Sequence, residues 1–140
     1  MIQKIVIAGA TAACLVNIAE AQRIAYDQSI DCVRVKNEGG NNYEMGQCAG
    51  RARQEVDAQL NLVYGQLRSE LKGTEEEKSL VEAQRSWIIW RDKEADLCAR
   101  SSGFSPKGSG FGMVSASCVS ALTAERTKSL RSYLRDIKSR

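Results

Sequence analysis

The chain of 140 residues contains no histidine, and this absence narrows the chemistry that it can perform. Serine–histidine and cysteine–histidine catalysis both depend on an imidazole as the general base. Without imidazole, a transition-metal site would have to be built from thiolates and carboxylates alone. The missing histidine therefore excludes these two kinds of catalysis. We expect a protein that is not an enzyme, with no catalytic residue, no metal site and no cofactor.

The chain also has little excess charge of either sign. Its 20 Lys and Arg are nearly balanced by 17 Asp and Glu, which leaves a net charge of +3. Binding to nucleic acid and attachment to an acidic membrane both rely on concentrated positive charge. We therefore expect no nucleic acid among the partners, and no polybasic membrane anchor.

Long apolar runs are scarce, and the longest, residues 5–18, stands at the start of the chain after Lys4. The Ala-Glu-Ala sequence at residues 19–21 then matches the small-x-small rule of signal-peptide cleavage. The run is too short for a membrane-spanning helix. We expect a signal peptide at residues 1–21, export to the periplasm or the exterior, no stable membrane insertion, and a single domain at residues 22–140.

The five cysteines indicate an oxidising compartment. Cys14 lies in the predicted signal peptide, which leaves an even set in the exported chain: Cys32, Cys48, Cys98 and Cys118. An even number of cysteines in a small exported protein predicts disulfides, here two. A lipoprotein acylated at Cys14 is the alternative, but Thr11 stands where such signals usually have leucine or another branched aliphatic residue.

Apolar residues recur at steps of three and four in three long stretches, which is the pattern of amphipathic helices. The first stretch follows Asn41, which forms a capping box with Glu44, and it contains Gly65, where another helix could approach closely. The second follows Thr74, with Glu77 as the matching partner of a second capping box. The third covers about residues 113–137, and its spacing places Tyr133 on the inward face.

These stretches predict an all-α fold, a small disulfide-stapled antiparallel helical bundle with three long helices. Residues 22–41 are expected to form an irregular N-terminal arm. Cys48 and Cys98 are equally distant from the turn at Gly73, so all four remaining cysteines should lie at the opposite end of the bundle. Three pairings are open, and we favour the local pairs Cys32–Cys48, which would pin the arm, and Cys98–Cys118, which would close the loop before the last helix.

The most apolar stretch of the exported chain, residues 83–92, holds both tryptophans, Trp87 and Trp90, which are expected to be core anchors. Arg91 and Arg126 fall on apolar stripes, where a buried guanidinium must be paired. We interpret them as a structural polar knot with Gln84 and Asp92. The alternative is an anion pocket, as in a small-molecule enzyme, built from Arg51, Arg85, Arg91 and Arg126.

Residues 101–112 form a glycine-rich loop that contains the only proline of the chain. Loops held by a rigid scaffold often carry binding residues. This loop is expected to expose Phe104, Lys107 and Phe111, which makes it the candidate inhibitory loop of a binding protein. A plain flexible connector is the alternative.

Four stretches together resemble the LprI-like lysozyme inhibitor family of exported bacterial proteins. They are Glu44-Met45-x-x-Cys48-Ala49, Leu60-Asn61-x-x-Tyr64-x-x-Leu67, Ala83-Gln84-Arg85-x-Trp87-Ile88-x-x-Arg91-Asp92 with Cys98, and Cys118 with Leu122-Thr123-x-x-Arg126-Thr127-x-x-Leu130. The resemblance implies a helical, disulfide-bonded domain that inhibits c-type lysozymes. It supplies no set of inhibitory residues, so none is carried over.

We therefore expect a non-enzymatic binder that occludes the substrate cleft of a c-type lysozyme and so protects peptidoglycan. In this hypothesis the loop at residues 101–112 enters the cleft and Lys107 faces the two catalytic carboxylates. A periplasmic structural or envelope-stress interaction protein is the alternative. The protein should be a monomer, or a homodimer formed through the Trp-rich face of the second long helix if the other two long helices leave that face uncovered.

Overall fold

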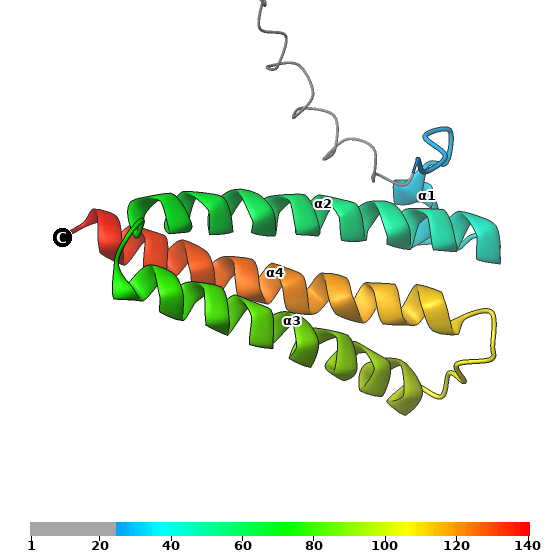
Figure 1. Cartoon of the computed structure of the whole chain (residues 1–140). Helices are drawn as coiled ribbons and strands as arrows, with labels where there is room; N and C mark the ends of the chain where they lie inside the picture. The colour runs from blue at the N-terminus through cyan, green and yellow to red at the C-terminus, as the bar shows by residue number, and fades with distance from the viewer. Residues whose placement is uncertain (1–24) are drawn as a thin grey trace, which may run out of the picture.

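The computed structural model describes residues 25–140, and within that range it contains four helices and no strand. The helices are α1 (Cys32–Glu38), α2 (Asn42–Glu70), α3 (Glu75–Ser101) and α4 (Phe111–Lys138). Figure 1 shows α2 and α4 running in one direction and α3 in the other. The predicted all-α bundle of three long helices is confirmed, whereas the predicted signal peptide at residues 1–21 lies outside the described residues.

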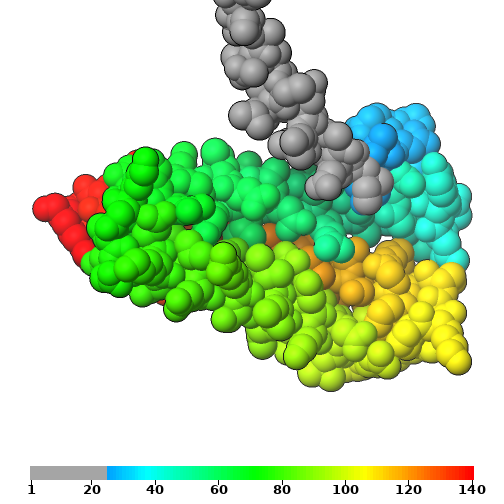
Figure 2. Space-filling view, in the orientation of Figure 1, coloured from blue at the N-terminus to red at the C-terminus, as the bar shows by residue number. Residues whose placement is uncertain are grey.

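The last helix is the centre of the bundle. α4 packs against both α2 and α3, and Figure 1 shows it between them. The main apolar cluster draws on all three long helices and lies toward the α2–α3 turn; it consists of Leu60, Val63, Leu67, Leu71, Leu80 and Leu130. Figure 2 shows a hollow between α2 and α3 in the half nearer the α3–α4 loop, with α4 as its floor.

The ends of the long helices follow from their capping residues. Asn41 and Glu44 form the predicted capping box at the start of α2. Thr74 caps α3 by accepting a hydrogen bond from the Glu77 backbone N–H at 3.2 Å. The Glu77 carboxylate does not complete the second box as predicted, because it accepts the backbone N–H of Gly73 at 2.8 Å instead. Gly73 has a φ of 82°, a left-handed conformation that glycine adopts without strain.

The prediction of an irregular N-terminal arm is wrong for part of its length, because residues Cys32–Glu38 form α1. The carboxylate of Asp31 caps this helix by accepting the backbone N–H groups of Val33 and Arg34. Val35 is buried against the bundle. A side-chain cap, one buried contact and a disulfide thus hold a helix that is too short to show a periodic apolar stripe.

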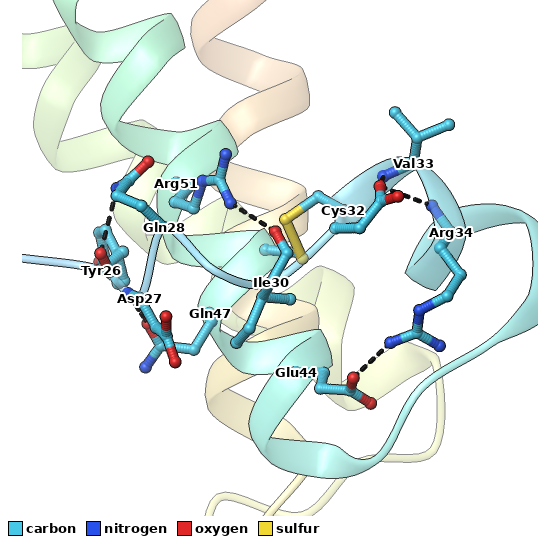
Figure 3. Close-up of a disulfide and its surroundings, with 12 residues drawn as sticks. Tyr26, Asp27, Gln28, Ile30, Cys32, Val33, Arg34, Glu44, Gln47 and Arg51 are labelled. Carbon is cyan, nitrogen blue, oxygen red and sulfur yellow. Dashed lines mark hydrogen bonds and ion pairs between the residues drawn. A yellow bond between two sulfur atoms is a disulfide. The ribbon is translucent and has the colours of Figure 1, made fainter.

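Both disulfides lie at the end of the bundle away from the α2–α3 turn, as expected. They join Cys32 to Cys48 and Cys98 to Cys118, the two local pairs that the sequence favoured. Figure 3 shows the first pair fixing the arm to α2, next to a hydrogen bond of 2.9 Å from Arg51 to the carbonyl of Ile30 and an ion pair between Arg34 and Glu44.

Three expectations about packing are wrong. Trp90 is 49% exposed and is not a core anchor, although Trp87 packs against the apolar cluster. Tyr133 of α4, which the helical pattern placed inward, is also exposed. Within residues 25–140, no atom lies close enough to Gly65 to require a glycine there, whereas a Cβ atom on Gly50 would meet the Tyr26 ring at 2.3 Å. The arm, rather than another helix, makes the close approach to α2.

Candidate functional site

The loop between α3 and α4 is built from consecutive hydrogen-bonded turns. α3 ends at Ser101 with Ser102 as its C-cap, and the Phe104 N–H donates back to the carbonyl of Ala99 at 3.2 Å. The Gly108 N–H then donates to the carbonyl of Ser105 at 2.7 Å, which closes a four-residue turn with proline in its second position. Proline suits this position because its fixed φ matches the turn.

Lys107 occupies the third position of that turn and is exposed. Its side chain makes no ion pair within residues 25–140. Its ammonium group is therefore presented to solvent on a hydrogen-bonded turn, and the Cys98–Cys118 disulfide joins the two helices that carry this turn.

Of the two phenylalanines of the loop, Phe104 is exposed as predicted and Phe111 is not. Phe104 is 38% exposed, and its ring lies against Gly110, where an added Cβ would come within 2.6 Å of a ring carbon. Phe111 is not displayed as predicted. It is the first residue of α4, is partly buried, and has the Arg100 guanidinium 5.8 Å from its ring centroid. The hydrogen bond from Arg100 to Asp96 raises the pKa of Arg100 further above neutral pH, so the cation over this ring persists.

An apolar surface is exposed on α3, within the Trp-rich helix face considered above for dimerisation, but its residues were not among the predicted site residues. Ile89 is 61% exposed and Leu97 is 58% exposed, and Trp90 lies beside them. Trp90 and Leu97 are seven residues apart and so share one face of α3, the helix that leads directly into the loop. The run Ile88-Ile89-Trp90 already signals this surface, because three consecutive apolar residues on a helix cannot all face one partner.

The predicted polar residues of α3 and α4 are brought together around Trp87. Arg91 is only 8% exposed; its Nη2 lies 2.8 Å from Asp92 Oδ1 and its Nη1 3.5 Å from Asp57 Oδ1 on α2. Arg126 of α4 donates from Nε to Gln84 Oε1 at 3.1 Å. Both guanidinium groups approach the Trp87 ring, at 5.2 and 5.9 Å from its centroid.

The alternative pocket of four arginines is not assembled. Arg51 donates to the carbonyl of Ile30 in the arm, and Arg85 is exposed. Arg91 is neutralised by carboxylates, which leaves Arg126 as the guanidinium of this set that is partly buried and has no ion pair within residues 25–140. The described part of the chain also contains no group of three or more Cys, Asp and Glu residues that could hold a metal ion.

Fold and site together define a small helical bundle, stapled by disulfides at one end, that presents a turn-built loop and an adjoining apolar helix face. The chain matches the family model described as "Lysozyme inhibitor LprI" over residues 32–130. The match spans all four cysteines of the two disulfides and the whole loop, and the chain therefore belongs to this family of lysozyme inhibitors.

A curated relative is an uncharacterized protein of Rhizobium meliloti (strain 1021), which is 28% identical over 100 residues. That alignment covers 62% of this chain and 69% of the relative. No solved structure matches the chain. In the range 25–140, none of the helices combines the length and the apolar character needed to cross a membrane.

Proposed function

We propose that the protein is exported, binds a c-type lysozyme, and occludes its substrate cleft so that peptidoglycan is protected. The observation that carries this proposal is membership of the lysozyme inhibitor family over residues 32–130. That range includes both disulfides, which suit an oxidising compartment outside the cytoplasm.

The loop is the element that we propose to enter the cleft. A glycosidase cleft contains two carboxyl groups close together, and a cation can pair with them. Lys107 supplies such a cation at the tip of the turn, and the half-exposed ring of Phe104 supplies apolar contact beside it. Holding the turn between two helices joined by a disulfide reduces the ordering entropy lost on binding.

The apolar face of α3 (Ile89, Trp90 and Leu97) is the proposed second contact. Exposed aromatic side chains are common among the residues that dominate binding energy at protein interfaces. The same face would also serve the alternative function, an envelope protein with another partner.

Charge gives the proposal a distinctive salt dependence. The chain carries a net charge of +3, and c-type lysozymes are basic, so the two proteins repel each other at long range. Salt screens this repulsion between separated surfaces more than it weakens a desolvated contact. Inhibition should therefore persist or improve as the ionic strength rises from a low value.

The test uses purified, oxidised residues 22–140, added in increasing amounts to a c-type lysozyme while the clearing of a bacterial cell-wall suspension is followed. Dose-dependent inhibition that is lost on disulfide reduction is expected. No inhibition at any salt concentration, with several c-type lysozymes, would contradict the proposal and leave the envelope partner to be found by pull-down.

Variants separate the two contacts. Lys107→Ala and Phe104→Ala should each weaken inhibition if the loop enters the cleft, and Trp90→Ala should do so if the α3 face contacts the enzyme. Lys128→Ala is the matched control, because Lys128 is an exposed lysine of α4 paired only with its neighbour Glu125. Inhibition that is unchanged by Lys107→Ala and Phe104→Ala would exclude the loop.

A further inference from the structure

A groove of about 390 Å³ lies at the end of the bundle opposite the loop. Its apolar lining includes Leu67 of α2 and Leu71 just after that helix, Leu80 and Ala83 of α3, and Ile137 of α4. The volume falls within the range of small-molecule sites, which are largely apolar with a few convergent polar groups. The groove is separate from the surfaces proposed to contact lysozyme.

Arg126 lines one end of this groove and has unused hydrogen-bonding capacity. Its Nε donates to Gln84, but within residues 25–140 its Nη atoms have no hydrogen bond and no ion pair. Arg91 of α3, by contrast, forms ion pairs with the carboxylates of Asp57 and Asp92. A partly buried guanidinium with free donors favours a carboxylate ligand, which it can bind through two parallel hydrogen bonds.

The other end of the groove has a different charge pattern. Glu76 and Asp136 line it together with Arg140. The two carboxylates would repel a second anionic group of a ligand at this end. Arg140 follows the end of α4 and lies about 20 Å from Arg126 along the direction of that helix, given a rise of about 1.5 Å per residue. The groove therefore suits an elongated molecule with one negative end and an apolar body, and it does not suit a polyanion.

We propose that this groove binds an alkyl monocarboxylate of medium chain length, with its carboxylate on the Nη atoms of Arg126 and its chain over Leu80 and Ala83 toward Ile137. Binding would place an anion on a guanidinium that already lies 5.9 Å from the Trp87 ring centroid. The fluorescence of Trp87 should respond, and exposed Trp90 provides a constant background.

Decanoate is the probe, titrated by calorimetry into the oxidised protein below its micelle concentration. We expect saturable binding with one site per chain, and clearly weaker binding of both 1-decanol, which lacks the charge, and acetate, which lacks the chain. Equal binding of decanol and decanoate would overturn the role of Arg126, and no binding of decanoate would overturn the proposal altogether.

Two variants test the site from independent directions. Arg126→Gln removes the cation, and it should weaken decanoate binding roughly tenfold or more, as expected for a lost charged hydrogen bond. Ala83→Leu fills the groove without changing any charge, at an exposed helix position where leucine is well tolerated, and should weaken it as well. Binding that survives Ala83→Leu in a folded variant would contradict the proposal even if Arg126→Gln failed to fold.

Arg135→Gln is the matched control, since Arg135 is an exposed arginine of α4 that does not line the groove. It should bind decanoate as the unmodified protein does, and equal losses in Arg135→Gln and Arg126→Gln would indicate nonspecific charge attraction and overturn the proposal. Lysozyme inhibition is measured separately on the same variants, so that the proposal of ligand binding in the groove and the proposal of lysozyme inhibition are tested independently.

Discussion

Arg91 of α3 lies opposite Asp57 of α2, with Arg91 Nη1 3.5 Å from Asp57 Oδ1. The contact links two helices that both pack against α4. Arg91 is almost fully buried, and its guanidinium is also held by Asp92 and lies over the Trp87 ring. A long cationic side chain thus fills space between the helices while its charge stays compensated.

Replacing Arg91 with alanine should destabilise the bundle by about 2–3 kcal/mol, because charged hydrogen bonds and buried side-chain contacts are lost together. The free energy of unfolding in urea measures this loss. Lys78→Ala is the control, since the Lys78–Glu75 ion pair is exposed and should contribute less than about 1 kcal/mol. If Arg91→Ala lowered the free energy of unfolding by no more than Lys78→Ala does, the ion pairs of Arg91 would not stabilise the bundle.

The two glycines inside α2 should respond to alanine in opposite ways. Gly65→Ala should raise the free energy of unfolding by about 1 kcal/mol, since alanine is the better helix former and no neighbouring group of the described chain lies within 4 Å of the new Cβ. Gly50→Ala should lower it, because the new Cβ would overlap the Tyr26 ring and displace the arm. Urea unfolding of both variants, under oxidising conditions, distinguishes the two; equal gains would mean that Tyr26 does not hold the arm on α2.

The sequence predicts the long helices well because their signals are local. The capping box of Asn41 and Glu44 and the three-and-four spacing of apolar residues need no knowledge of the rest of the chain. The disulfide pairing needed one further choice, because the turn at Gly73 gathers the cysteines at one end of the bundle but leaves three pairings open. The preference for local pairs selected the two disulfides that form.

The features that the sequence did not reveal depend on which side of a helix is covered. α3 packs mainly on α4, so an apolar side chain on its far face, such as Trp90, stays exposed. That a residue is apolar does not by itself tell whether its face of the helix is buried or exposed. Arg91 and Arg126 were grouped with Gln84 and Asp92 from the sequence, but the partner of each guanidinium is set in the folded chain. There, Asp57 and Asp92 pair with Arg91, and the amide of Gln84 accepts from Arg126.

Thr123 of α4 is fully buried, and its hydroxyl has no hydrogen-bond partner within residues 25–140. Thr123→Val keeps the shape and removes the unsatisfied group, so it should stabilise the protein by about 1 kcal/mol or more. Thr127→Val is the opposite case, because the Thr127 hydroxyl donates to the Thr123 carbonyl at 2.8 Å and its loss should destabilise. Thermal and urea unfolding measure both changes, and a destabilising Thr123→Val would show that the hydroxyl is satisfied in solution.

Glu77 at the start of α3 should make stability depend on pH in the acidic range. The N–H of Gly73 and the guanidinium of Arg68 lower the pKa of this carboxyl below its ordinary value. Since the unfolded chain then binds the proton more tightly, the stabilisation is present above the ordinary glutamate pKa, about 4.3, and is lost as the pH falls through the lower folded value. Glu77→Gln should therefore unfold at a lower urea concentration than the unmodified protein at neutral pH, with the difference disappearing in strong acid.

Glu76→Gln is the control, because it removes the same charge one residue earlier, where the carboxylate has no ion pair among the described residues. It should show a smaller difference. A Glu77→Gln difference that stays constant down to strong acid would mean that the ionised carboxylate does not stabilise the turn.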